Sequence, residues 1–240
     1  MKQKPKHRTT KKVRHSLTIE WKTITIRGKP FERGVQHGKQ LSTELRRVFF
    51  VLPFLVQKMF NIQLVEYERI CKREIFPTIQ NDFPEFFQEL LGICHGAKSM
   101  GIHFTIDQLV AWNSFHSMFE YLNPRKHNVI QRCSAFIATG KATENGDIVM
   151  AHNSHCDLVS GSLHHIVMYV IPENGYPFIM QTCPGYICSA SDFFISSTGI
   201  VGPPFVWQNI FLTLGETILF SVVFGTPCNT EIPLMRMLIS

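Results

Sequence analysis

Hydrophobic and polar positions divide the chain into three regions with different periods. Residues 16–26 (SLTIEWKTITI) alternate between apolar and polar, which is typical of a β-strand. Residues from about 41 to 122 carry apolar positions at helical spacing, and short β-type runs follow from Cys133 onwards. Because helices come first and strands afterwards, the pattern predicts an α+β fold and not alternating βαβ units.

Two helix boundaries stand out in the helical region. Pro84 opens a predicted helix that ends near Gly96. Thr105 and Gln108 form a capping box for a second predicted helix, which runs through residues 105–122. Its apolar positions fit a buried stripe and so favour core packing over a cofactor cradle: Ile106, Leu109, Val110, Phe115 and Met118.

The region from Cys133 contains two hairpin signals. Residues 134–140 and 147–153 are joined through Asn145-Gly146, and residues 164–171 and 177–182 through Asn174-Gly175. Residues 186–190 and 193–197 continue the β pattern, and residues 205–224 favour buried sheet over a membrane span because Glu216 lies within them. The predicted organisation is a basic tail (1–16), a mainly helical region (17–132) and an antiparallel sheet region (133–240).

The positive charge of the chain is concentrated at its N-terminus. The net charge is +6, but residues 1–15 alone hold seven Lys or Arg and no acid, so the remaining chain is close to neutral. This tail could contact phosphates of nucleic acid or an anionic membrane. Since no aromatic residue interleaves its lysines, we favour a solvated tail and expect no specific nucleic-acid partner.

Cysteine usage and the lack of an export signal predict a reducing, cytoplasmic environment. The tail is not followed by an apolar stretch of about 7–15 residues, as a signal peptide requires. The seven cysteines are an odd number without paired metal spacing, so reduced thiols are expected. The apolar content excludes a mainly disordered chain.

Cys133 follows a polar, basic connector, residues 123–132, of the kind that is exposed and open to cleavage. If the bond from Arg132 to Cys133 were cut, Cys133 would carry both a thiol and a free α-amine. An α-amine titrates at about 7.7–8.0 and can serve as the base for its own thiol. The alternative is that Cys133 is one inert buried cysteine among seven.

Three segments resemble the peptidase C45 family, whose relatives include acyl-CoA:isopenicillin N (6-aminopenicillanic acid) acyltransferase. They are residues 28–41 (GKPFERGVQHGKQL), 133–153 (CSAFIATGKATENGDIVMAHN) and 179–201 (IMQTCPGYICSASDFFISSTGIV). The resemblance covers about three-quarters of the chain, in the order of the family. It implies an N-terminal-nucleophile hydrolase fold, in which two stacked antiparallel sheets lie between helical layers.

The resemblance also implies roles for individual residues. Cys133 would be the nucleophile, both in self-cleavage after Arg132 and in acyl transfer or amide hydrolysis. Asn153 would orient the nucleophile or its amine, with His152 beside it, although Asn153 could equally cap a turn. Relatives have an Asp where this chain has His155, which leaves Asp157 as the nearest acid. Asp192 would be a further supporting residue at the site. Gly34, His37 and Gly38 are expected to serve backbone packing.

The same resemblance implies no metal and no resident cofactor, with acyl-CoA as a possible substrate. The expected partners are a small-molecule acyl donor and an amine or water acceptor. Three departures from the family support an alternative, an inactive or truncated remnant that acts as a binding module. Arg132 stands where many relatives have Gly, residues 203–214 look like an insertion, and the chain stops at Ser240 before relatives end.

Overall fold

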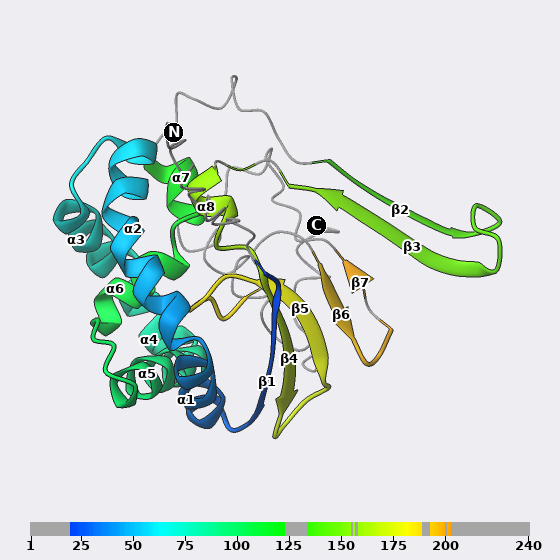
Figure 1. Ribbon diagram of the computed structural model, residues 1–240, viewed down its shortest axis with the longest axis horizontal. Coiled ribbons are helices and arrows are strands. Elements are labelled where there is room, and N and C mark those ends of the chain that lie inside the picture. The colour runs from blue at the N-terminus through cyan, green and yellow to red at the C-terminus, as the bar shows by residue number, and fades with distance from the viewer. Residues whose placement is uncertain are drawn as a thin grey trace, which may run out of the picture.

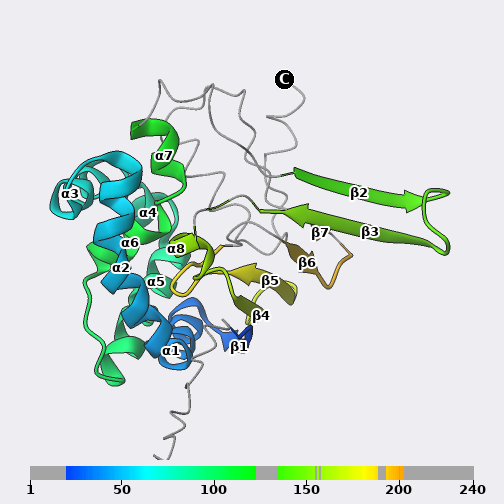
Figure 2. The same ribbon diagram turned by 45° about the horizontal axis from the view of Figure 1, so that its top comes forward.

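Helices and strands occupy opposite sides of the molecule. The computed structural model describes residues 20–122, 134–154, 156, 158–188, 193–199 and 201–202. Helices from the first half of the chain gather on one side, and most strands lie on the other (Figures 1 and 2). This confirms the α+β class predicted from the sequence. The expectations for Arg132, Cys133, Asp157 and Asp192, and for residues 205–224, fall outside the described residues.

The helical side follows directly from the first strand. After β1 (Lys22–Gly28) come α1 (Pro30–Gln40), α2 (Ser42–Phe60), α3 (Leu64–Glu74), α4 (Phe76–Asp82), α5 (Pro84–Ser99), α6 (Ile106–Asn113) and α7 (Ser117–Leu122). Pro84 opens α5 as predicted. Thr105 and Gln108 form the predicted capping box of α6, since the Thr105 hydroxyl accepts from the Gln108 N–H at 3.1 Å.

The helix predicted over residues 105–122 is in fact two helices. α6 ends at Asn113, and α7 begins at Ser117. At the break, the Ser114 hydroxyl donates to the Val110 carbonyl at 2.8 Å, the kind of side-chain hydrogen bond that competes with helical bonding. The apolar stripe still packs inward, because Phe115 and Met118 are buried together with Leu109 and Val110.

The strands form one five-stranded sheet and one separate ribbon. The sheet has the order β1-β4-β5-β6-β7, where β4 is Ile166–Pro172, β5 Phe178–Thr182, β6 Phe194–Ser196 and β7 Val201–Gly202. Its pairings are antiparallel except for β1 with β4, which is parallel. The pairings described within residues 133–240 are thus all antiparallel, as expected for that region, and β1 adds a parallel partner from the helical half of the chain, which the sequence did not predict.

Both predicted hairpins are present. β2 (Ser134–Gly140) pairs with β3 (Gly146–Asn153), and β4 pairs with β5, each antiparallel and each after an Asn-Gly turn. Gly146 and Gly175 have positive φ, a conformation that glycine adopts without steric cost. The continuation of the β pattern is correct at β6 but wrong at residues 186–188, which form turns and bends. A short helix, α8 (Leu158–Gly161), separates β3 from β4.

Two hydrophobic clusters hold the fold together. The larger cluster lies among the helices and includes Leu45, Leu52 and Trp112. The smaller cluster lies between α1 and the sheet, where Ile26, Met168 and other inward positions of β1, β4, β5 and β6 are buried. Inward and outward residues alternate along β4, so only one face of the sheet is covered by this core.

Candidate functional site

The strand pairing of the ribbon brings one predicted site residue next to the start of β2. Ser134, which follows Cys133 in the chain, is the register partner of Asn153, and Ala135 is the partner of His152. Ser134 and Asn153 are both exposed. The antiparallel pairing of β2 with β3 thus brings together two residues that are 19 positions apart in the sequence, and Asn153 lies opposite the residue that follows Cys133.

His152 and Asn153 are neighbours in sequence but lie on opposite faces of the ribbon, since successive strand residues alternate. The Nδ1 atom of His152 lies 3.4 Å from the hydroxyl of Ser154, a long contact for a hydrogen bond. Asn153 therefore shares its face with Ser134, and His152 shares the other face with Ala135. Asn153 is thus the residue opposite the first position of β2, and His152 is opposite the second.

The described cysteines differ sharply in their capacity to act as nucleophiles. Burial raises the pKa of Cys71, Cys94 and Cys188 to about 12, so these thiols stay protonated at neutral pH. Cys183 is fully buried, whereas Cys156 is exposed. Cys156 was not singled out in the sequence. It lies between β3 and α8, three residues after Asn153, and nothing in its sequence context marks it.

A buried turn at residues 183–188 packs against α1 and α6. Tyr186 donates its N–H to the Cys183 carbonyl at 3.1 Å, with Pro184 and Gly185 (φ +84°) at the centre of the turn. Trp112 donates from Nε1 to the Pro184 carbonyl at 2.8 Å. Asn113 accepts from the Ile187 N–H at 3.1 Å and donates to the Gly185 carbonyl at 2.8 Å. This buried turn is thus held by side chains from α6.

His37 completes the attachment of the buried turn. Its Nε2 accepts from the Gly185 N–H at 2.9 Å, and the ring is fully buried. Burial lowers the pKa of His37 to about 3, so the ring is neutral and acts as a hydrogen-bond acceptor. The structure therefore links residues 28–41 to residues 179–201.

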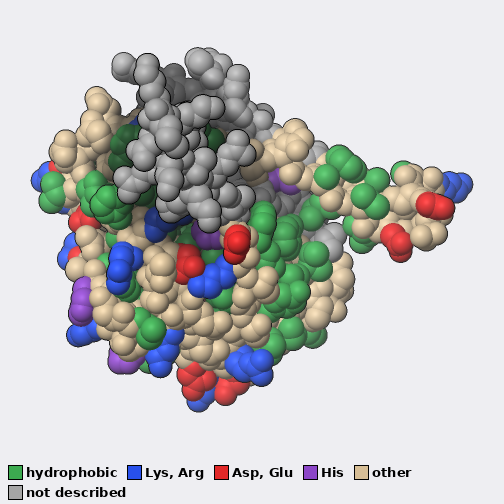
Figure 3. Space-filling view, in the orientation of Figure 1, with side chains coloured by type: hydrophobic (Ala, Val, Ile, Leu, Met, Phe, Trp, Pro, Cys, Tyr) green, Lys and Arg blue, Asp and Glu red, His purple; other side chains and the backbone are tan. Residues whose placement is uncertain are grey.

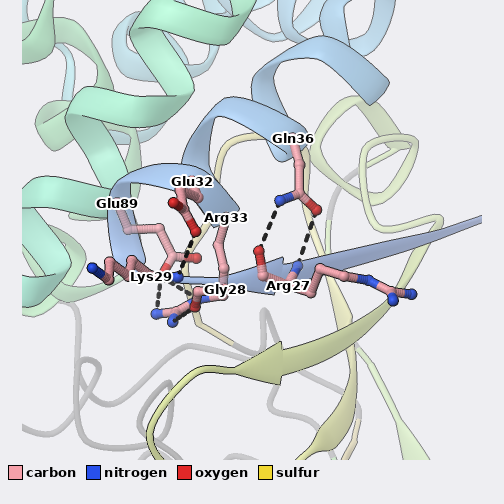
Figure 4. A network of polar contacts seen from close by, with 7 residues as sticks. All are labelled: Arg27, Gly28, Lys29, Glu32, Arg33, Gln36 and Glu89. Carbon is pink, nitrogen blue, oxygen red and sulfur yellow. Dashed lines mark hydrogen bonds and ion pairs between the residues drawn. The ribbon is translucent and has the colours of Figure 1, made fainter.

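A polar network fixes the corner between β1 and α1 (Figure 4). Arg33 donates to the Gly28 carbonyl at 3.0 Å and to the Glu89 carboxylate of α5 at 2.6 Å. Gln36 exchanges two hydrogen bonds with the backbone of Arg27, at 2.7 and 3.0 Å. Burial raises the pKa of Glu89 although the guanidinium of Arg33 lowers it. These contacts fix the orientation of β1, the edge strand that pairs with β4.

Glycines let α1 and α5 approach at backbone distance. A Cβ atom added to Gly34 would lie 2.0 Å from the Glu89 carbonyl oxygen, and one added to Gly92 would lie 2.2 Å from the Phe31 carbonyl oxygen. Gly38 and Gly96 are packed in the same way. Gly34, His37 and Gly38 therefore serve packing, as expected. The four-residue spacing of the glycines in both helices was the sequence signal for this contact.

The described part of the chain holds no cluster of three or more His, Cys, Asp or Glu suited to a metal ion. None of its single helices is long and apolar enough to span a membrane, and α2 with Leu64–Asp82 would do so only as a pair across an 82° bend. Comparison with protein-family models finds no match for the chain, and comparison with curated proteins finds none either.

Proposed function

We propose that the chain is a self-processing cysteine hydrolase or acyltransferase of the N-terminal-nucleophile type, with Cys133 as its nucleophile. The observation that carries this proposal is the pairing of Ser134 with Asn153. Consecutive Cα atoms are about 3.8 Å apart, so Cys133 is tethered within one residue of a strand position that faces Asn153. An amide side chain there can hydrogen-bond a thiol, an α-amine or a developing oxyanion.

Self-cleavage would proceed in two steps. The Cys133 sulfur attacks the carbonyl carbon of Arg132, the bond from that carbon to the Cys133 nitrogen breaks, and the nitrogen takes up the proton lost by the thiol. Water then attacks the resulting thioester, which releases the Arg132 carboxylate and restores the thiol. The chain beginning at Cys133 now carries a free amine and a thiol on the same residue.

Turnover would use the same sulfur with the new amine as its base. The amine accepts the thiol proton, the thiolate attacks the carbonyl of an amide or thioester substrate, and the leaving group departs with a proton. The acyl group is held as a thioester on Cys133 until water or an amine accepts it. Water gives hydrolysis, and an amine gives acyl transfer. Acyl-CoA is one possible donor, and no resident cofactor takes part in these steps.

The described thiols leave one competitor for the role of Cys133. Three are kept protonated by burial and Cys183 is buried too, so Cys156 is the one exposed thiol within the described residues. It is therefore the natural control. Cys156→Ala tests whether any thiol-dependent activity comes from Cys156, between β3 and α8, and not from Cys133.

The proposal is tested with a panel of chromogenic N-acyl p-nitroanilides. We expect a burst of p-nitroaniline and an acyl adduct, seen by peptide mass spectrometry, on the peptide that begins at Cys133. Cys133→Ala should lose both signals, Asn153→Ala should reduce the rate by about 100-fold or more if it supports the oxyanion, and Cys156→Ala should retain both. An adduct on Cys156, or turnover that survives in Cys133→Ala, would contradict the proposal.

A second candidate function, a non-catalytic binding module, is favoured by one observation. Apolar side chains on both faces of the ribbon are exposed, including Phe136 at 57% and Ile148 at 53%. Exposed apolar surface of this kind marks an interaction site. A stable, uncleaved protein whose Cys133 fails to react with iodoacetamide at neutral pH would support the binding module over the enzyme.

A further inference from the structure

Over β4, β5 and β6, the five-stranded sheet has an apolar outer face that the helices do not cover. Cross-strand register places Tyr169, Ile179 and Ile195 in one row across β4, β5 and β6. Tyr169 is 46% exposed and Ile195 is 42% exposed, while the alternate row, which includes Met168 and Met180, is buried. A sheet that is apolar on both faces requires a covering layer on each.

The ribbon of β2 and β3 also exposes apolar side chains that a covering layer would bury. Ile137 and Ile148 lie on one face and Phe136 and Val149 on the other, and each is about half exposed. A two-stranded ribbon alone is marginally stable in water. Figures 1 and 2 place the ribbon beyond β7, and Figure 3 shows hydrophobic side chains along the ribbon and on the flank of the body beside it.

We propose that residues 203–240 of the same chain dock on these two apolar surfaces, the outer sheet face and the ribbon. The segment begins directly after Gly202 in β7, which pairs with β6 beside Ile195. It therefore starts at the edge of the surface it would cover. The proposal concerns the fold around the ribbon and is independent of whether Cys133 is a nucleophile.

The composition and length of the segment match the surface. Its 38 residues are more than half apolar and contain three charged residues, Glu216, Glu231 and Arg236. Such a segment gains free energy from burial, as the exposed sheet face does. Extended at about 3.3 Å per residue, it could span on the order of 120 Å, which is enough to cross a five-stranded sheet several times.

The proposal is tested by photo-crosslinking of the full chain, with benzoylphenylalanine placed at Ile195 or Ile148. The matched control position is Val65, which is 74% exposed on α3, on the helical side. We expect both test positions, and not Val65, to crosslink within one chain to peptides from residues 203–240. The same links should form in Cys133→Ala, so a failure here is distinct from a failure of the proposed chemistry.

Crosslinking a mixture of ¹⁴N- and ¹⁵N-labelled protein shows whether a second copy of the chain covers the surface instead. Hybrid-mass crosslinks would show that a second copy covers the surface and would overturn the proposal, as would the absence of any link to residues 203–240 from both positions. As a second measurement, Ile195→Lys should speed amide exchange in residues 203–240 by about tenfold or more, because an apolar contact is lost. Val65→Lys should leave that exchange unchanged, and equal rates in both variants would contradict the proposal.

Discussion

The contact between α1 and α5 offers the sharpest test of the packing, through the substitution Gly34→Ala. The added Cβ would lie 2.0 Å from the Glu89 carbonyl oxygen and 2.8 Å from the Ile93 nitrogen, whereas ordinary Cβ contacts begin at 3.4 Å. Both atoms belong to the backbone of α5, so no side chain can rotate away. The helices must separate by more than 1 Å, which also loosens the contacts at Gly38 and Gly92.

Two opposing effects set the magnitude. Inserting a methyl group into a well-packed contact costs about 1–3 kcal/mol, and a clash with rigid backbone belongs at the upper end. The higher helix propensity of alanine relative to glycine stabilises the folded state by about 1 kcal/mol. We therefore expect Gly34→Ala to lower the free energy of unfolding by about 2 kcal/mol, which corresponds to a fall of about 4–8 °C in melting temperature.

Urea and thermal unfolding, followed by circular dichroism at 222 nm, measure this effect. Lys39→Ala is the matched control, because Lys39 is an exposed residue of the same helix and should change stability by less than about 0.5 kcal/mol. If Gly34→Ala were as stable as the parent chain or more stable, helix propensity would outweigh the clash. The close approach of α1 and α5 would then be refuted.

Three further predictions concern the buried polar groups. Arg33→Ala leaves the Glu89 carboxylate buried without its partner and should lower the free energy of unfolding by about 3–5 kcal/mol at neutral pH. Because burial raises the pKa of Glu89, the folded state binds this proton more tightly than the unfolded chain, so the loss should be smaller at pH 5 than at pH 8, and equal losses would contradict the pairing. The control Lys72→Ala, in an exposed ion pair, should show little loss at either pH. The His37 ring should remain neutral in an NMR titration down to pH 4.5, because burial lowers its pKa to about 3. The free energy of unfolding should also fall as the pH drops below 6.5, because the unfolded chain takes up a proton there and the folded chain does not. An NMR titration midpoint near 6.5 would show that the ring is not buried. Asn113→Ala removes two of the hydrogen bonds that hold the buried turn and should cost about 1–3 kcal/mol, with faster amide exchange confined first to that turn. Unchanged exchange would show that Asn113 does not hold it.

Local signals in the sequence predicted the elements that they encode directly. The Asn-Gly pairs specified both hairpins, and the Thr105–Gln108 capping box and Pro84 specified two helix starts. These features depend on residues a few positions apart, so local chemistry decides them. The register that pairs Asn153 with Ser134 was not predicted and follows from the observed hairpin.

Long-range packing explains what the sequence did not predict. The parallel pairing of β1 with β4 joins segments that are more than 140 residues apart, and no local pattern distinguishes a parallel from an antiparallel partner. The role of His37 depends on a turn that contains Gly185, which lies 148 residues further along the chain. This is a tertiary contact that no local pattern encodes.

The central claim, that Cys133 becomes a chain terminus, is tested most directly by the intact mass of the purified full chain. We predict two polypeptides, residues 1–132 and 133–240, whose masses sum to that of the uncut chain plus one water. Cys133→Ala should yield one uncut chain, and Cys156→Ala should be cut like the parent. A parent chain that remains one uncut polypeptide after prolonged incubation at neutral pH, or a cut that persists at the same bond in Cys133→Ala, would contradict the account.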